Sequence, residues 1–359
     1  MPITIFKVNV KPFIYIASLF VLSCCNKQEI YTILEDKKTS PVMEETDVSE
    51  ILCPDKLSFS DSCLVVINRK SEPFFYIYDK KTFSPKGKFG LTGNGPEDFI
   101  FPFFLEQIDT VSKTIAVYDV NLASFKDLNI SHLLAHQDSA VITSPMPPSL
   151  IGSSVLIKNK DIYYGNIDSG EGLFFIYDGQ TDTREWIPFP ASLLPAEGDF
   201  TVMNANRIAA NPISGKIVSG MRYYNKVFLY DIKTRKILKE AQIGNEEVSP
   251  IVHNQSLDGN SKLCCMEIHA SKQYIYILMQ NIKEKDWERP EGAASRIIVL
   301  DWNLNYVRTY QLAHHTNSFA VDSSCNRILY TAADYEGNTK LYYWTEVIPA
   351  LPETIEDAK

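Results

Sequence analysis

The chain has 359 residues, of which 45% are hydrophobic and 12% aromatic, and its formal net charge is −9 at neutral pH. This composition is that of a packed globular protein and excludes a largely disordered chain. The acidic balance, together with the lack of an extended Lys/Arg cluster, argues against a nucleic-acid partner.

The N-terminus carries the pattern of a secretory leader. Two lysines precede a short apolar run from Phe13 to Val21, which is too short to span a bilayer and is typical of a signal-peptide core. The small residue Ser23 before Cys24 resembles the lipobox of bacterial lipoproteins, whose cysteine becomes the lipidated first residue. We therefore predict a lipoprotein signal peptide over residues 1–23. A plain signal peptide and a cytoplasmic start are the alternatives.

The predicted lipid on Cys24 fixes the expected location of the mature chain. Acyl chains on this residue would anchor it in the cell envelope, at the outer membrane or the periplasmic face, so the membrane is an expected partner. Residues 24–50 are mostly polar and charged, which is typical of a tether between an anchor and a folded domain.

A pattern of paired strand-like runs recurs along the rest of the chain. The first runs begin near residues 63, 114, 161, 216, 274 and 326, that is, 47 to 58 residues apart. A third run follows most pairs and a fourth precedes them. These runs are β-branched and aromatic with turn residues between them, and no long segment has a helical period.

Six such units predict an all-β fold, a six-bladed β-propeller of four-stranded antiparallel blades over residues 51–348. Radial repetition of blades protects strand edges that one very large sheet would leave exposed. Residues 349–359 are expected to form a C-terminal tail. Because the prolines and acidic residues near this end make a poor strand, we predict that Ile30–Leu34 supplies the strand that closes the ring.

A glycine-rich segment, KFGLTGNGPEDF at 88–99, resembles the linker after a blade in TolB-like and NHL-like six-bladed propeller lipoproteins. The matching residues are Phe89, Gly90, Gly93, Gly95, Pro96 and Phe99. The resemblance implies a binding scaffold more than a reaction. Gly93 to Pro96 is interpreted as a turn with positive φ. A dinucleotide site is disfavoured, because Asp98 stands at the third glycine position and no helix follows.

The cysteines give no metal-binding spacing. The envelope permits a disulfide between Cys53 and Cys63, but buried free thiols are the preferred interpretation. The carboxylates that end the paired runs recur with the repeat, and we interpret them as acceptors in turns rather than as catalytic groups. They are Asp79, Asp178, Asp231 and Asp301.

Candidate ligand-binding residues lie in the loops between the second and third strands of the blades, which share one face with the blade-to-blade connections. They are Arg69, Asn121, Arg222, Tyr223, Trp287 and Arg289, and Asp168 lies in the same set of loops. The fifth loop, 280–295, is the longest, as functional or mobile loops often are. An aromatic ring and an arginine there suit a contact with a partner or glycan. Alternatively, Trp287 packs on its own blade.

The sequence favours a non-enzymatic binding or interaction module for a protein or carbohydrate ligand. No catalytic residue and no metal ligand is assigned. The alternative is a calcium-dependent hydrolase or lactonase with its site in the propeller channel, which would make calcium the cofactor. Glu267, Asn204, Asn206 and Asp322 lie in or near inner strands and are the oxygen donors expected to face such a channel.

Overall fold

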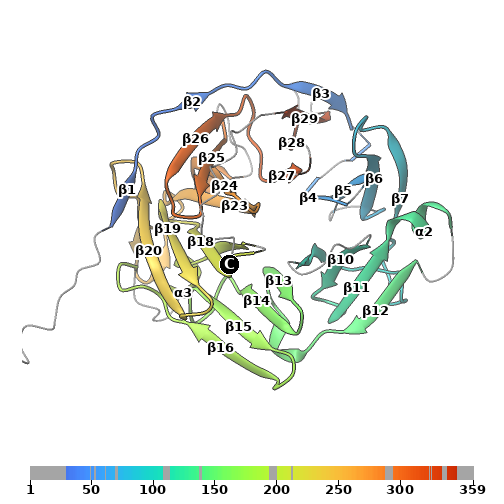
Figure 1. Cartoon of the computed structure of the whole chain (residues 1–359), viewed down its shortest axis with the longest axis horizontal. Helices are drawn as coiled ribbons and strands as arrows, with labels where there is room; N and C mark the ends of the chain where they lie inside the picture. Colours follow the sequence, from blue (N-terminus) through green and yellow to red (C-terminus); the bar gives the residue numbers. More distant parts are fainter. Residues whose placement is uncertain are drawn as a thin grey trace, which may run out of the picture.

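The computed structural model describes residues 30–345 except 49, 52–53, 61, 69–71, 108–113, 137–139, 194–199, 212, 288–293, 323, 325 and 334–337. The predicted signal peptide, Cys24, Cys53, Arg69, Arg289 and the C-terminal tail lie outside the described residues. Six sheets, mainly antiparallel, stand around a central axis (Figure 1). This arrangement is a six-bladed β-propeller, as predicted.

Each blade runs from an inner strand at the axis to an outer strand at the rim. Blade 1 has β4 (Lys56–Phe59), β5 (Cys63–Ile67), β6 (Phe75–Asp79) and β7 (Pro85–Phe89); blade 2 has β8 (Pro102–Phe104), β10 (Thr114–Asp119), β11 (Ser124–Asn129) and β12 (Val141–Pro145); blade 3 has β13 (Val155–Asn159), β14 (Ile162–Asn166), β15 (Phe174–Asp178) and β16 (Thr183–Ile187). Blade 4 has β17 (Asn206–Ala210), β18 (Lys216–Met221), β19 (Lys226–Asp231) and β20 (Lys236–Ile243); blade 5 has β23 (Lys262–Ala270), β24 (Tyr274–Lys283), β25 (Arg296–Asp301) and β26 (Tyr306–Gln311); blade 6 has β27 (Phe319–Asp322), β28 (Arg327–Ala333) and β29 (Thr339–Thr345).

The remaining elements are short and lie between or beside the blades. They are the hairpin β21 (Val252–His253) and β22 (Ser256–Leu257), the strand β9 (Glu106–Gln107), the helices α2 (Ile130–Leu134) and α3 (Phe200–Met203), and the 3-10 turns η1 (Pro148–Leu150) and η2 (Glu284–Asp286). Strand β9 leaves blade 2 and pairs in parallel with β13 of blade 3.

The predicted repeat starts coincide with the second strand of each blade to within one residue. These strands are easy to recognise because they lie between neighbouring blades with both faces covered, so they are continuously apolar. Every residue of β5 is buried, for example. Blade 1 and blade 6 share one apolar cluster that includes Tyr76, Phe83, Leu329 and Leu341, and this contact closes the ring.

The segment before blade 1 wraps around the rim of blades 4, 5 and 6 (Figure 1). Its three strands are β1 (Tyr31–Ile33), β2 (Lys38–Thr39) and β3 (Glu44–Asp47). Strands β1 and β2 pair in parallel with β20 and β26, whereas β3 pairs antiparallel with β29. We call residues 31–47 the N-terminal belt. The predicted tether is therefore part of the folded ring from residue 31 onward.

The prediction that Ile30–Leu34 closes the ring is wrong. Strand β3 supplies the fourth strand of blade 6, and β1 adds a fifth strand to blade 4. The reason is that the outer strand of blade 6 is exposed to water, so it suits polar side chains. Glu45 of β3 forms an ion pair with the Lys340 ammonium of β29 at 2.8 Å. The apolar residue Ile33 instead fills the core between blades 4 and 5, where it is fully buried.

The turns at the blade rims confirm the interpretation of the recurrent aspartates. Asp79 accepts the backbone N–H groups of Lys81 and Thr82, and its counterparts on blades 3, 4 and 5 accept equivalent turn donors. The ammonium of Lys86 and these N–H groups lower the pKa of Asp79. A residue with positive φ follows in each turn: Phe83, Asp182, Arg235 and Leu304.

The glycine-rich segment joins blade 1 to blade 2, but not through the backbone conformation we expected. The left-handed residue is Gly90, with a φ of +88°, and neither Gly93 nor Gly95 adopts this conformation. Those two positions need glycine because an added Cβ would lie 2.2 and 2.8 Å from the Asp98 side chain. The buried Lys126 of blade 2 holds the segment in place, because its ammonium donates to the carbonyl oxygen of Pro96 at 2.8 Å.

The preferred interpretation of the cysteines holds for those that the structure describes. Cys63, Cys264 and Cys265 are buried free thiols. Burial raises the pKa of Cys264 to about 12 and shifts Cys265 in the same direction. Both thiols therefore stay protonated near neutral pH and are poor nucleophiles.

Candidate functional site

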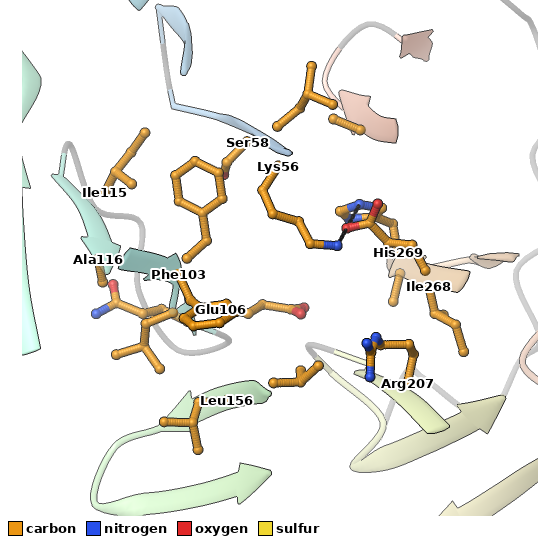
Figure 2. A pocket seen from close by; sticks show the side chains of 18 of the residues that line it. Lys56, Ser58, Phe103, Glu106, Ile115, Ala116, Leu156, Arg207, Ile268 and His269 are labelled. Atoms are coloured by element: carbon orange, nitrogen blue, oxygen red, sulfur yellow. Dashed lines mark hydrogen bonds and ion pairs between the residues drawn. The ribbon is translucent and has the colours of Figure 1, made fainter. Parts of the chain in front are cut away.

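The inner strands of the six blades enclose a cavity of about 360 Å³ on the propeller axis (Figure 2). Its wall combines aromatic and aliphatic side chains with a few ionisable ones. The ionisable residues are Lys56 from blade 1, Glu106 from β9, Arg207 from blade 4, and Glu267 and His269 from blade 5. A small, largely pre-formed cavity with a few converging polar groups is the usual form of a small-molecule site.

Lys56 and Glu267 form an ion pair across the cavity, between the ammonium Nζ and Oε1 at 2.5 Å. The second oxygen of Glu267 accepts the backbone N–H of Phe319 at 3.1 Å. Burial opposes the charged form of Glu267, but the Lys56 ammonium outweighs it, and the pKa of the carboxyl is lowered. Blades 1, 5 and 6 are therefore linked at the axis by one charged carboxylate.

His269 lies beside this ion pair without joining it closely. Its Nε2 is 3.7 Å from Oε1 of Glu267, and its ring meets the Phe319 ring edge-on, with the centroids 4.6 Å apart. Burial lowers the pKa of His269. The imidazole is therefore neutral at neutral pH and adds no positive charge to the cavity.

Arg207 connects the cavity with the face that carries the loops between second and third strands. Its Nη1 donates to Oδ1 of Asp168 at 2.9 Å. Asp168 also accepts the hydroxyl of Ser154 at 3.0 Å. Burial opposes the charge on Asp168, but Arg207 and these donors prevail and lower its pKa. Arg207 thus enters the cavity with its charge already balanced.

Glu106 differs from the other ionisable groups of the cavity. Its side chain is open to the cavity, and its carboxyl points toward the space between Lys56 and Arg207 (Figure 2). The surrounding blades reduce the contact of this carboxyl with bulk water, and this desolvation raises the pKa of Glu106 to about 7. Within the described part of the chain, the carboxyl has no hydrogen-bond or ion-pair partner.

The structure brings together three of the residues predicted from the loops. The guanidinium of Arg222 lies 5.6 Å from the centre of the Tyr223 ring and 5.4 Å from that of Trp287. Tyr223 is buried, and Trp287 is half-buried against the main core cluster. Trp287 therefore packs across the boundary between blades 4 and 5, which limits the surface it offers to a partner.

The other predicted loop residues do not join this group. Asn121 is exposed on blade 2, where its backbone N–H donates to Asp119. Arg69 and Arg289 lie outside the described residues. Of the ionisable residues in the cavity, the sequence had pointed only to Glu267 as a group that could face the channel, whereas His269 had been interpreted as a satisfied or exposed histidine rather than a ligand. Their shared signal is that they lie on or next to innermost strands.

The four oxygen donors considered for a calcium site do not meet. Asn206 donates to the carbonyl oxygen of Leu173, and Asn204 accepts the hydroxyl of Tyr224. Asp322 is paired with a lysine of blade 1. In the ranges that the structure describes, no three His, Cys, Asp or Glu side chains lie close enough to hold a metal ion. Near Glu267, the Lys56 ammonium takes the position that a bound cation would need.

The comparisons with known proteins agree with the six-bladed fold. The model of a family described as "TolB-like 6-blade propeller-like" matches residues 209–324, which run from blade 4 into blade 6. Over that stretch the chain is similar to TolB-like propellers, and its fold is a six-bladed β-propeller. No curated protein matches its sequence.

Two crystal structures share the propeller architecture of this chain. A member of the DUF4221 family from Bacteroides vulgatus has a TM-score of 0.61 at 12% identity, over 85% of this chain and 96% of the other. A candidate exported protein from Bacteroides fragilis has a TM-score of 0.53 at 14% identity, over 89% of this chain and all of the other. At these identities the likeness concerns the fold.

Among the residues that the structure describes, no helix is both long enough and apolar enough to cross a bilayer.

Proposed function

We propose that this propeller is a non-enzymatic binding module of the cell envelope, anchored by a lipid on Cys24, which holds a small polar molecule in its axial cavity. The observation that carries the proposal is the cavity itself, in which Glu106 is left without a partner while the neighbouring charges are balanced. An ionisable side chain that faces a cavity, has no partner within the protein and has a shifted pKa is a typical candidate for a ligand site.

The contacts of the ionisable groups favour binding over catalysis. Among the described residues, Nε2 of His269 has no hydrogen-bond partner, so it does not activate a hydroxyl or thiol. Lys56 holds the Glu267 carboxylate and lowers its pKa, so this carboxyl is not poised to take up a proton near neutral pH. The calcium-dependent alternative has less support, because three of its four candidate ligands are engaged elsewhere in the fold.

A substitution that fills the cavity tests where the ligand binds. Ser58 lines the cavity on the inner strand β4, and Ser58→Trp would occupy much of the free volume. Ser144, exposed on the outer strand β12, provides a matched control as Ser144→Trp. We expect at least one small polar probe among benzylamine, acetate and glucose to raise the melting temperature of the mature chain and of the control.

The same probe should leave Ser58→Trp unshifted, provided that its circular dichroism spectrum shows a folded ring. Equal shifts in all three proteins would place the binding outside the cavity. A complete lack of shifts across the panel would count against a small-molecule site of this kind.

The anchor has its own test, which uses the cysteine next to Cys24 as the control. We expect Cys24→Ala to lose both incorporation of labelled palmitate and recovery in the membrane fraction, whereas Cys25→Ala keeps both. The predicted signal peptide and the candidate exported relative from Bacteroides fragilis support this location. A labelled Cys24→Ala protein would contradict the assignment of the lipid.

A further inference from the structure

Strand β9 places Glu106 in the cavity wall at the junction of two blades. After β8, the chain leaves blade 2, and Glu106 pairs with Ile157 on the innermost strand of blade 3. This short parallel pairing holds the backbone at a fixed position while the side chain extends into the cavity (Figure 2). The carboxyl is thus presented by a hydrogen-bonded strand rather than by a free loop.

The ionised side chains around the cavity include one more carboxylate than cations, and the carboxylate without a cation is Glu106. Lys56 is matched by Glu267 at 2.5 Å, and Arg207 is matched by Asp168 at 2.9 Å. His269 is neutral, since burial lowers its pKa. Two cations therefore face two carboxylates that already hold them, and a third carboxylate remains with no cation among the described residues.

We propose that Glu106 receives the protonated amino group of a small organic amine, which supplies the missing cation of the cavity. This inference rests on the proposed function and specifies the chemical class of its ligand. A carboxylate and an ammonium group form a charge-assisted hydrogen bond, the strong form of this interaction. The existing ion pairs reduce the repulsion that Lys56 and Arg207 would otherwise exert on an incoming amine.

The rest of the wall suits the carbon skeleton of such a ligand. Phe59, Phe103 and Phe104 line the cavity together with aliphatic side chains. Aromatic rings attract ammonium groups and pack against apolar skeletons. A volume of about 360 Å³ lies at the small end of the usual range, which favours a compact amine over a polymer.

Binding of an amine should depend on pH through Glu106. The groups that face this carboxyl are Lys56, Arg207, Glu267 and His269, and Lys158 follows its pairing partner on β13. Because the pKa of Glu106 is about 7, part of the population carries a proton at neutral pH. An ammonium ligand prefers the charged carboxylate, so it displaces that proton. Below pH 7 its affinity should fall by up to about tenfold per pH unit.

Benzylamine and benzyl alcohol form a matched pair of probes, since they differ in the ammonium and hydroxyl groups. Calorimetric titration of the full mature chain is expected to show binding of benzylamine and at least tenfold weaker binding of benzyl alcohol. Glu106→Gln should weaken benzylamine at least tenfold and abolish its dependence on pH between 6 and 8. Glu97→Gln, at an exposed glutamate of the linker between blades 1 and 2, should behave like the wild type.

The number of protons released on binding is a second measurement. It would not change on substitution of Glu106 if this residue had only a structural role. In two buffers with different ionisation enthalpies at pH 7, wild-type binding should release about half a proton, and Glu106→Gln binding should release none. If benzylamine binds Glu106→Gln as tightly as wild type, the amine assignment is overturned. Should Ser58→Trp still abolish that binding, the cavity remains the ligand site and only the recognising group is wrong. Unchanged binding in both variants overturns the proposed function as well.

Discussion

The carboxylates at the blade rims and the carboxylate in the axial cavity have opposite environments. Asp79 receives two backbone N–H groups and the Lys86 ammonium, and its pKa is lowered. Glu106 faces the cavity without such donors, and desolvation raises its pKa to about 7. The rim carboxylates stabilise turns that each blade forms on its own. The cavity carboxylate has an environment that exists only when all six blades have assembled.

This difference separates the groups that hold the ring from the group assigned to the ligand. The rim and the N-terminal belt satisfy their polar groups by local or edge pairing, and their loss should reduce stability. Glu106 is left unsatisfied, and its loss should change binding while stability is kept or improved.

Deletion of the belt should have the largest effect. Removal of residues 31–47 exposes the outer edges of three blades and takes Ile33 out of the core between blades 4 and 5. We expect the melting temperature to fall by more than about 10 °C, or the folded state to be lost. Thermal unfolding followed by circular dichroism measures this change.

A point substitution within the belt provides the control for the deletion. Val42 is 95% exposed, so Val42→Ser should leave the melting temperature unchanged. A deletion variant that melts like the wild type would show that the belt lies on the ring without stabilising it.

Asp119 tests whether burial alone makes a carboxylate functional. It is fully buried at the end of β10, and it accepts the backbone N–H groups of Ile100, Phe101, Asn121 and Leu122. Asp119→Ala leaves these donors without a partner, which should cost about 3–5 kcal/mol of unfolding free energy. Urea denaturation measures the loss. Asp178→Ala, in a rim turn, should cost less than about 1 kcal/mol.

The architecture was largely predictable, and the reason lies in where the sequence signal is strongest. The second strands, such as β5, are buried on both faces and read as continuous apolar runs, so the repeat starts were found to within one residue. The rim aspartates were interpreted correctly because their partners lie two to four residues away. Both signals are local.

The cavity and the closing strand were not predictable for the opposite reason. Lys56 and Glu267 are 211 residues apart in sequence, and nothing in either neighbourhood indicates that they pair. Strand β3 has the sequence EETD, which lacks any strand signature, because its partner β29 supplies the hydrogen bonds and water covers its other side. The closing strand was predicted at β1 because β1 is more apolar than β3. However, the buried apolar residue of β1, Ile33, packs on blade 4.

The ion pair between Lys56 and Glu267 should contribute an intermediate amount of stability. Lys56→Ala leaves the Glu267 carboxylate confined with the Phe319 N–H but without its cation, which should cost about 2–3 kcal/mol. The pKa of Glu267 should then rise. Urea denaturation at pH 7 gives the cost, and the double variant Lys56→Met/Glu267→Met should recover much of it, because no unpaired charge remains. A double variant as unstable as Lys56→Ala would indicate that packing, rather than charge, is responsible.

The effect of Glu106→Gln on stability should have the opposite sign to the effects of the other substitutions. In the folded chain the pKa of Glu106 is about 7, above its value in the unfolded chain, so between those two values the folded state binds more protons. The contribution of this carboxyl to stability is therefore greatest below its unfolded pKa and is lost as the pH rises through about 7. Glutamine does not titrate, so the ligand-free variant should gain in melting temperature relative to wild type between pH 5 and pH 8, and the difference should level off above pH 8. Scanning fluorimetry across this range measures the gain, with Glu97→Gln as the flat control. A gain that is absent or that shrinks toward pH 8 would mean that Glu106 has a stabilising partner, and the contrast between rim and cavity would not hold.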